Sequence, residues 1–100
     1  MDIVKFEQFV KVCECKSLTK AAEALFISQT ALSQAISAME DYFSCKLFDR
    51  EGKKLVLNEK GKLAYQYSLR ILDNISELKG KLIEGVYETK PLKNSVTSLK

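Results

Sequence analysis

The segment SLTKAAEALFISQTALSQAISAMEDYF, residues 17–43, decides the fold of this chain. It holds two runs with helical periodicity, separated by a turn of about three residues. The apolar faces of the two runs consist of Leu18, Ala21, Ala22 and Leu25, and of Leu32, Ala35, Ile36, Met39 and Phe43. Ser17 and Thr19 offer cap oxygens for the first run, and Ser28 is a good N-cap for the second run. The segment predicts a helix-turn-helix at about residues 18–37, whose second helix can enter the major groove of DNA.

The flanking residues predict a helix before this segment and a hairpin after it. Residues 2–14 repeat apolar side chains at helical spacing. Leu47-Phe48 and residues 55–57 are short β-capable runs on either side of Glu51-Gly52. A two-stranded ribbon in this place is a wing. The predicted fold class is therefore mainly α: a winged helix-turn-helix of three helices and a short two-stranded wing over residues 1–58.

A long linker helix is predicted for residues 59–89. Asn58 can cap it, and we expect Gly61, Gly80 and Gly85 to be tolerated within it. Roughly 30 residues at 1.5 Å each give about 45 Å. Its apolar stripe needs a partner, and a second copy of the chain is the simplest candidate. The residues predicted for this dimerisation surface are Ala64, Tyr67, Ile71, Ile75, Leu78 and Leu82.

Length and charge set limits on the function. One hundred residues make about one domain. Residues 1–57 hold eight Lys and Arg against eight Asp and Glu, so the excess that gives a net charge of +3 lies beyond them. The net charge of residues 1–57 therefore does not by itself indicate a nucleic-acid partner. No apolar run is long enough for a membrane span, and the N-terminus lacks the pattern of a signal peptide, which predicts a cytoplasmic protein without a membrane partner.

The sequence does not contain the sets of residues that usually form a metal site or a catalytic site. Cys13, Cys15 and Cys45 are an odd set without any histidine, whereas a tetrahedral zinc site takes four ligands and a disulfide framework takes an even number. We expect reduced thiols, no metal and no cofactor in this chain. The sequence also has no phosphate-binding glycine loop and no carboxylate pair with an obvious pocket, so it is not predicted to be an enzyme and has no predicted catalytic residue.

Residues 1–62 resemble the N-terminal domain of LysR-type transcriptional regulators, and the resemblance continues along the predicted long helix to about residue 88. It implies a winged helix-turn-helix with a dimerising linker helix in a bacterial regulator. It also implies a larger domain from near residue 91, which would bind a small-molecule effector and to which the polar residues 90–100 would lead. The matching residues are Phe9-Val10, Ser17-Leu18-Thr19, Ala21-Ala22, Leu25, Ser28-Gln29, Ser33, Ile36, Glu40, Leu47-Phe48, Arg50, Leu57 and Gly61.

The chain departs from the family pattern at several positions. The family often has proline at the position of Thr30 and a basic residue at those of Gln34 or Ser37, so this helix carries fewer phosphate-pairing charges than many relatives. Ser44 stands where glycine is usual after the third helix. A left-handed backbone conformation at this position costs a non-glycine residue about 1 kcal/mol. Asn58 replaces the usual threonine, and both are competent caps.

The outer face of the predicted third helix lies about 200° from its apolar stripe. It has no charge from residue 28 to 39, whereas an ordinary solvent-facing surface is rich in Lys and Glu. Its amides can donate and accept together, as the adenine edge requires, and its hydroxyls suit base edges or phosphates. The residues of this face predicted to bind DNA are Ser28, Gln29, Thr30, Ser33, Gln34 and Ser37.

Four basic residues are predicted to contact the DNA backbone or minor groove, namely Lys20, Arg50, Lys53 and Lys54. Arg50 could instead form a salt bridge within the domain. Lys53 and Lys54 could instead belong to an ordinary charged turn without a role in binding.

The predicted function is sequence-specific binding of a partly palindromic operator in double-stranded DNA by a homodimer, and the assembly of dimers into tetramers is left open. Its two third helices would lie about 34 Å apart or a multiple of it. Two alternatives remain at this level. One is a helical protein-interaction module that uses the winged fold only as scaffold. The other is a redox sensor built on Cys13 or Cys45.

Overall fold

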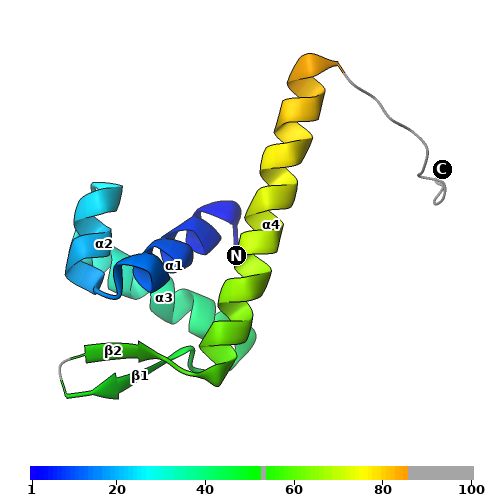
Figure 1. Cartoon of the computed structure of the whole chain (residues 1–100). Coiled ribbons are helices and arrows are strands. Elements are labelled where there is room, and N and C mark those ends of the chain that lie inside the picture. Colours follow the sequence, from blue (N-terminus) through cyan, green and yellow to red (C-terminus); the bar gives the residue numbers. More distant parts are fainter. Residues whose placement is uncertain (53, 86–100) are drawn as a thin grey trace.

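The computed structural model describes residues 1–52 and 54–85. Three helices form a cluster, an antiparallel hairpin lies at one end of it, and a long helix runs past both and projects beyond them (Figure 1). This is the predicted mainly α architecture of three helices, a two-stranded wing and a long helix. In chain order the elements are α1 (Ile3–Cys15), α2 (Leu18–Leu25), α3 (Gln29–Phe43), β1 (Phe48–Glu51), β2 (Lys54–Leu57) and α4 (Glu59–Glu84).

Side-chain caps fix where the helices begin. The Ser17 hydroxyl accepts from the Lys20 N–H at the start of α2, and the Ser28 hydroxyl accepts from the Ala31 N–H at the start of α3. Asn58 caps α4 in the same way, through Oδ1. Each cap satisfies a backbone donor that the first helical turn leaves unpaired. The caps predicted at these three positions are confirmed.

The first three helices end in a residue with left-handed backbone. Lys16, Phe26 and Ser44 have φ of 56°, 58° and 58°. The left-handed conformation predicted for Ser44 is therefore confirmed. It lets the Ser44 and Cys45 N–H groups bond back to the last turn of α3, so that the chain turns sharply toward the hairpin.

The core lies where α1, α2 and α3 meet the beginning of the hairpin. Phe9 and Phe48 pack edge to face with their ring centroids 5.7 Å apart. The prediction that Phe43 faces inward is wrong, because its side chain is 45% exposed at the last position of α3. The buried apolar cluster comprises Phe9, Val12, Ala21, Ala22, Leu32, Ile36, Met39, Leu47 and Phe48.

The hairpin pairs Phe48 with Leu57 and Glu51 with Lys54. Gly52 follows β1 with φ of 65°, a conformation that suits glycine at a tight turn. The register places Phe48 and Leu57 next to the core, whereas Glu51, Gly52 and Lys54 are exposed. The wing is therefore anchored at its base.

The long helix α4 packs along α1 through its first half. Gly61, which we expected merely to be tolerated, lies against the carbonyl oxygen of Leu47, and a Cβ at this position would overlap that oxygen. The predicted end at residue 89 does not match the described helix. Gly85 adopts φ of 75° and caps α4 after Glu84, and residues 86–89 lie outside the described part, as do residues 90–100.

The three cysteines form no disulfide among the residues that the structure describes. Burial, and next the neighbouring Glu14 carboxylate, raise the pKa of the Cys13 thiol to about 12. A thiol with this pKa stays protonated at neutral pH and is a poor nucleophile. Within residues 1–52 and 54–85 no three acidic or thiol groups gather as metal ligands, and no helix is long and apolar enough to cross a bilayer.

Candidate nucleic-acid interface

Helix α3 divides into a buried face and a polar face. Leu32, Ile36 and Met39 are at most 6% exposed and hold the helix on α1 and α2. On the opposite side Ser33 is half-buried, and the other predicted reading residues, Ser28, Gln29, Thr30, Gln34 and Ser37, are exposed. The fold therefore presents to solvent the uncharged stripe that the sequence pattern indicated.

Ser28 differs from the other residues of the stripe because its hydroxyl oxygen already accepts the Ala31 N–H at 3.0 Å. Its first role is to start α3. The hydroxyl proton remains available to an outside acceptor. Ser28 therefore contributes to the interface mainly by fixing where the helix begins.

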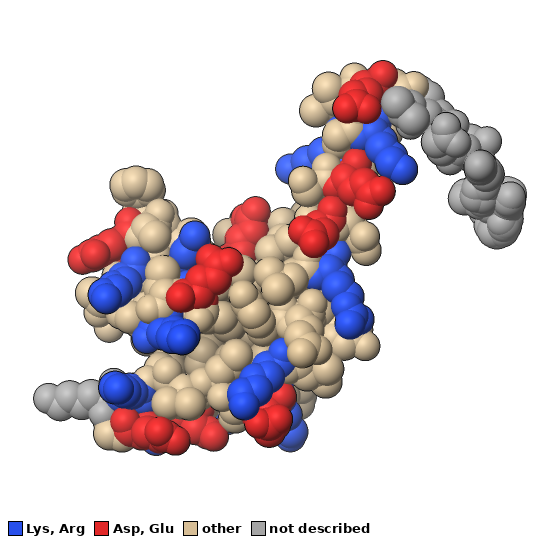
Figure 2. Space-filling view, in the orientation of Figure 1, with Lys and Arg blue, Asp and Glu red and all other residues tan. Residues whose placement is uncertain are grey.

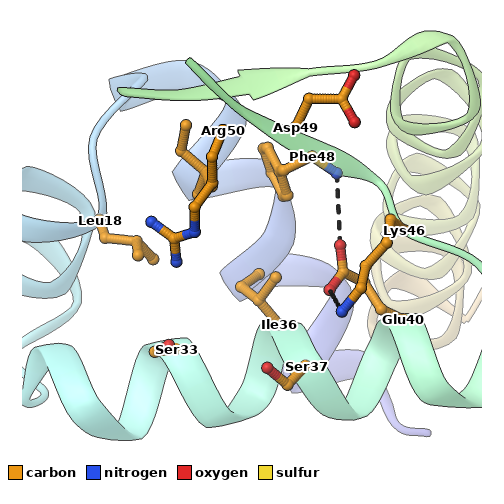
Figure 3. A pocket seen from close by; sticks show the side chains of 10 residues that line it. Leu18, Ser33, Ile36, Ser37, Glu40, Lys46, Phe48, Asp49 and Arg50 are labelled. Atoms are coloured by element: carbon orange, nitrogen blue, oxygen red, sulfur yellow. Dashed lines mark hydrogen bonds and ion pairs between the residues drawn. The ribbon is translucent and has the colours of Figure 1, made fainter. Parts of the chain in front are cut away.

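A hollow of about 370 Å³ separates α3 from the hairpin (Figure 3). Ser33 and Ser37 line it from α3, and Leu18 lines it from α2. In Figure 3 the Arg50 side chain reaches down from β1 toward α3, beside Leu18. Within the described residues Arg50 has no carboxylate within 4.0 Å, so its alternative role in an internal salt bridge finds no partner there. Its guanidinium remains available to an anion.

Glu40 fixes the base of the hairpin to α3, a role that the sequence did not reveal. It is 8% exposed. Its Oε2 accepts the Leu47 N–H at 2.7 Å and the Phe48 N–H at 3.4 Å, and its Oε1 lies 3.7 Å from Lys46 Nζ. A buried carboxylate that accepts backbone N–H groups forms strong, oriented hydrogen bonds. Glu40 thus sets the position of the wing relative to the reading helix (Figure 3).

A second hollow, of about 300 Å³, lies between the start of α2, the start of α3 and the hairpin. Its lining includes three cations, Lys16, Arg50 and Lys54, and no carboxylate. Lys16 was not among the residues predicted from the sequence to bind DNA. The signal available was its position directly before the Ser17 cap, which places its side chain near the N-terminus of α2.

Thr19 and Gln29 also line this second hollow, and they are hydrogen-bonded to each other. The Thr19 Oγ1 lies 3.0 Å from the Gln29 Oε1, so that the first turn of α2 is joined to the first residue of α3. From the sequence, Thr19 was expected to offer a cap oxygen and was one of the residues that match the family. The two residues are ten positions apart, and only the helix-turn-helix geometry brings them together.

The other two basic residues predicted to contact DNA are Lys20 and Lys53. Lys20 is exposed on α2 and lines neither of them. Lys53 lies outside the described residues. Figure 2 shows basic and acidic side chains interspersed over the helices and the wing, in agreement with the balanced count over residues 1–57. Positive charge on this domain is therefore concentrated in small areas, and the carboxylate-free hollow is one of them.

The predicted dimerisation residues fall into two groups. Ala64 is half-buried and packs against the core of its own chain, so that it already has a partner there. Ile71 and Ile75 are also half-buried. Tyr67, Leu78 and Leu82, by contrast, are 52%, 56% and 53% exposed. The outer part of the stripe on α4 is thus left uncovered by this chain.

Comparison with known proteins agrees with this geometry. The family model described as bacterial regulatory helix-turn-helix protein, lysR family, matches residues 3–62. The HTH-type transcriptional regulator CitR of Bacillus subtilis (strain 168) is 36% identical over 74 residues, which are 74% of this chain and 25% of CitR. The RuBisCO operon transcriptional regulator of Allochromatium vinosum is 38% identical over 80 residues, which are 78% of this chain and 26% of that protein. The chain thus spans about a quarter of the length of these curated relatives.

Solved structures show the same arrangement. The crystal structure of the BenM DNA-binding domain in complex with benA site 1 DNA has a TM-score of 0.80 and 30% identity, and covers 84% of this chain and 98% of that chain. A full-length BenM mutant has a TM-score of 0.79 and 28% identity, over 89% of this chain and 29% of that chain. The resemblance recognised in the sequence is confirmed by a family match over more than half of the chain. This chain belongs to the bacterial regulatory helix-turn-helix proteins of the lysR family.

Proposed function

We propose that this chain is the DNA-binding part of a LysR-type transcriptional regulator, and that it reads DNA with α3 in the major groove and the wing on the backbone or minor groove. The observation that carries the proposal is the uncharged, exposed face of α3, with the cations Arg50 and Lys54 beside it on the hairpin. Amides and hydroxyls hydrogen-bond to base edges, and cations pair with phosphates. The BenM domain, which has the same fold, was crystallised with DNA.

The active unit in this proposal is a homodimer. The exposed apolar side chains along α4 support a second copy as partner, because an apolar stripe on an exposed helix face marks a surface that binds a partner. A dimer would place two copies of α3 on a partly palindromic operator, about 34 Å apart or a multiple of it. In the whole protein, dimers can pair into tetramers.

Regulation in the whole protein would come from a domain beyond this chain that binds a small-molecule effector. The chain itself needs no cofactor for DNA binding and would not act as an enzyme. Its place of action would be the cytoplasm, where bacterial DNA lies.

Selection of bound duplexes from a random DNA pool tests the proposal directly. We expect the chain to enrich one partly palindromic site and to bind random duplex more weakly, with an affinity that falls steeply as salt rises. A protein-interaction module that uses the fold only as scaffold would enrich no sequence and show no salt-dependent binding to DNA.

Point variants separate the reading helix from the wing. Gln29→Ala or Ser33→Ala should cost about 1–3 kcal/mol on the selected site and little on random duplex. Lys54→Ala should weaken binding to all duplexes and lower the salt slope by about 1. Lys79→Ala removes the same charge from the projecting half of α4 and should leave both affinities unchanged. Equal losses on specific and random DNA for Gln29→Ala would remove Gln29 from the base-reading set.

A further inference from the structure

The hydrogen bond between Thr19 and Gln29 restricts what Gln29 can offer to DNA. Both side chains are exposed, and Gln29 is the first residue of the reading helix. The acceptor is the amide oxygen Oε1, at 3.0 Å, so the Thr19 hydroxyl is the donor. Among the described residues no side-chain hydrogen bond engages the Gln29 Nε2 group.

The two hydrogens on Nε2 are therefore what Gln29 presents toward a partner. A glutamine that is free to rotate can pair with adenine in a bidentate way, since it donates to N7 and accepts from N6 at the same time. That mode needs Oε1 beside Nε2 at the base edge. With Oε1 turned toward Thr19, the amide presents only donors to the base. Guanine offers the two acceptors O6 and N7, and thymine offers O4, whereas the N7 acceptor of adenine stands beside an N6 donor that would be left without an acceptor.

The surroundings favour the same kind of partner. Thr19 and Gln29 line the carboxylate-free hollow together with Lys16, Arg50 and Lys54. All three cations are hydrogen-bond donors only. An acceptor-rich surface such as the edge of a guanine next to its phosphate complements this set of donors.

We propose that Thr19 is a positioning residue that holds the Gln29 amide with Nε2 outward, and that it thereby directs Gln29 to guanine or thymine rather than adenine. The inference rests on the proposed function, since it assigns the base preference of one residue in the DNA-reading face. Thr19 itself touches no base in this scheme.

The chain offers a matched pair of variants at position 19. Thr19→Val keeps the shape of the side chain but removes the hydroxyl, and Thr19→Ser keeps the hydroxyl but removes the methyl group. Helix α2 is capped by Ser17, which neither variant changes. Because Thr19 itself is exposed, we expect both variants to fold. Melting curves of the two variants next to the unchanged chain verify this.

The experiment selects duplexes from a random pool with the unchanged chain, Thr19→Val, Thr19→Ser and Gln29→Ala. The site position whose preference is lost in Gln29→Ala identifies the base that Gln29 reads. We expect guanine or thymine there for the unchanged chain and for Thr19→Ser. For Thr19→Val the preference over adenine should fall about tenfold, because the amide can then turn to the bidentate adenine mode.

Gln29→Glu tests the same idea without altering Thr19. It replaces Nε2 by a second acceptor oxygen while Thr19 can still donate to the first. The preference at the identified position should move to bases that offer a donor, namely cytosine or adenine. This variant tests the inference even where Thr19→Val does not fold.

Each contrary outcome has a distinct meaning. Failure of the unchanged chain to enrich any duplex overturns the proposed function, and the inference with it. With a site enriched, three results overturn the inference alone: adenine at the Gln29-dependent position, the same profile for Thr19→Val as for the unchanged chain, or a Thr19→Ser profile that matches Thr19→Val. A uniform loss on all duplexes for Gln29→Ala also overturns it, since the amide would then hold a phosphate instead of a base.

Discussion

The two halves of α4 share one helix but have different surroundings. The first half contains Gly61 and Ser68, both buried, and packs on α1 and the base of the hairpin. The second half has no buried residue and carries Leu78 and Leu82 more than half exposed. Figure 1 shows this half projecting beyond the three-helix cluster. One continuous helix thus joins the core of the domain to a surface that lacks a partner within the chain.

Because α4 spans both halves, it connects the proposed DNA-binding face to the proposed dimer surface. A helix transmits position along its length because its backbone hydrogen bonds make it stiff. Whatever covers the projecting half is therefore held at a fixed orientation relative to α3 and the wing. The glycine in each half gives the first way to test the contrast.

Gly61→Ala should produce the largest effect. A Cβ at Gly61 would overlap the Leu47 carbonyl oxygen and the Leu57 Cδ1, and the Leu47 carbonyl cannot easily move because it accepts the Asn58 N–H at 3.1 Å. We expect a loss of about 3 kcal/mol in the free energy of unfolding, the upper part of the range for overpacking. Urea unfolding followed by circular dichroism measures it.

Gly80→Ala is the matched control in the projecting half, where an added Cβ meets no atom within 4 Å. Because alanine favours a helix interior more than glycine, it should stabilise the chain by up to about 1 kcal/mol. Similar effects of the two substitutions would mean that the halves of α4 do not differ as described.

Glu40→Ala should give the next largest effect, since it acts on the same junction from the other side. Both backbone polar groups of Leu47 are hydrogen-bonded, its N–H to the Glu40 carboxylate and its carbonyl oxygen to the Asn58 N–H. Removal of the carboxylate leaves the N–H groups of Leu47 and Phe48 buried without an acceptor, at a cost of about 2 kcal/mol. Thermal unfolding measures it.

Glu40→Gln keeps an oxygen that can accept from the Leu47 N–H and should lose clearly less than Glu40→Ala. Equal losses for the two variants would contradict a role for Glu40 as backbone acceptor. In the DNA-binding assay Glu40→Ala should also weaken the salt-dependent contacts of the hairpin, because the base of the wing is no longer fixed to α3.

Leu78→Lys tests the projecting half alone. Leu78 is 56% exposed in the single chain, so a charge there should leave folding intact and oppose an apolar interface. We expect the dissociation constant of the dimer to rise at least about tenfold, equivalent to about 1.4 kcal/mol. Sedimentation over a range of concentrations measures it.

Ser76→Lys adds the same charge two residues away, on the opposite side of the helix, and should leave the dimer intact. A monomer at tens of micromolar for the unchanged chain, or equal effects of the two substitutions, would remove the dimer from the proposed function.

The sequence predicted what depends on neighbours along the chain. The caps at Ser17, Ser28 and Asn58 are local, since each bonds to a backbone N–H three residues ahead, and all three were predicted. The faces of α2 and α3 were predicted from their periodicity, with Phe43 as the exception. That residue continues the periodic stripe at the last position of α3, and periodicity carries no information on how far the neighbouring elements cover a helix.

What the sequence could not show depends on contacts between elements. Gly61 was expected merely to be tolerated, because the Leu47 carbonyl that approaches it lies in another element. The bond from Thr19 to Gln29 and those from Glu40 to the start of β1 likewise join separate elements. In the candidate site the exposed stripe on α3 was therefore predictable, whereas the groups that orient its members were not.

Ser44→Gly should have the smallest effect and tests how α3 ends compared with α4. Both helices end in a left-handed residue, Ser44 with φ of 58° and Gly85 with φ of 75°, but only α4 uses the residue that adopts this conformation without strain. Glycine at position 44 should stabilise the chain by about 1 kcal/mol, less a part lost to the greater freedom of glycine in the unfolded chain. For a domain of this size that corresponds to a rise of up to about 4–8 °C in the melting temperature. Ser44→Ala keeps the Cβ and should give no such rise, so a lower melting temperature for Ser44→Gly, or equal values for the two variants, would show that the left-handed backbone at residue 44 carries no strain.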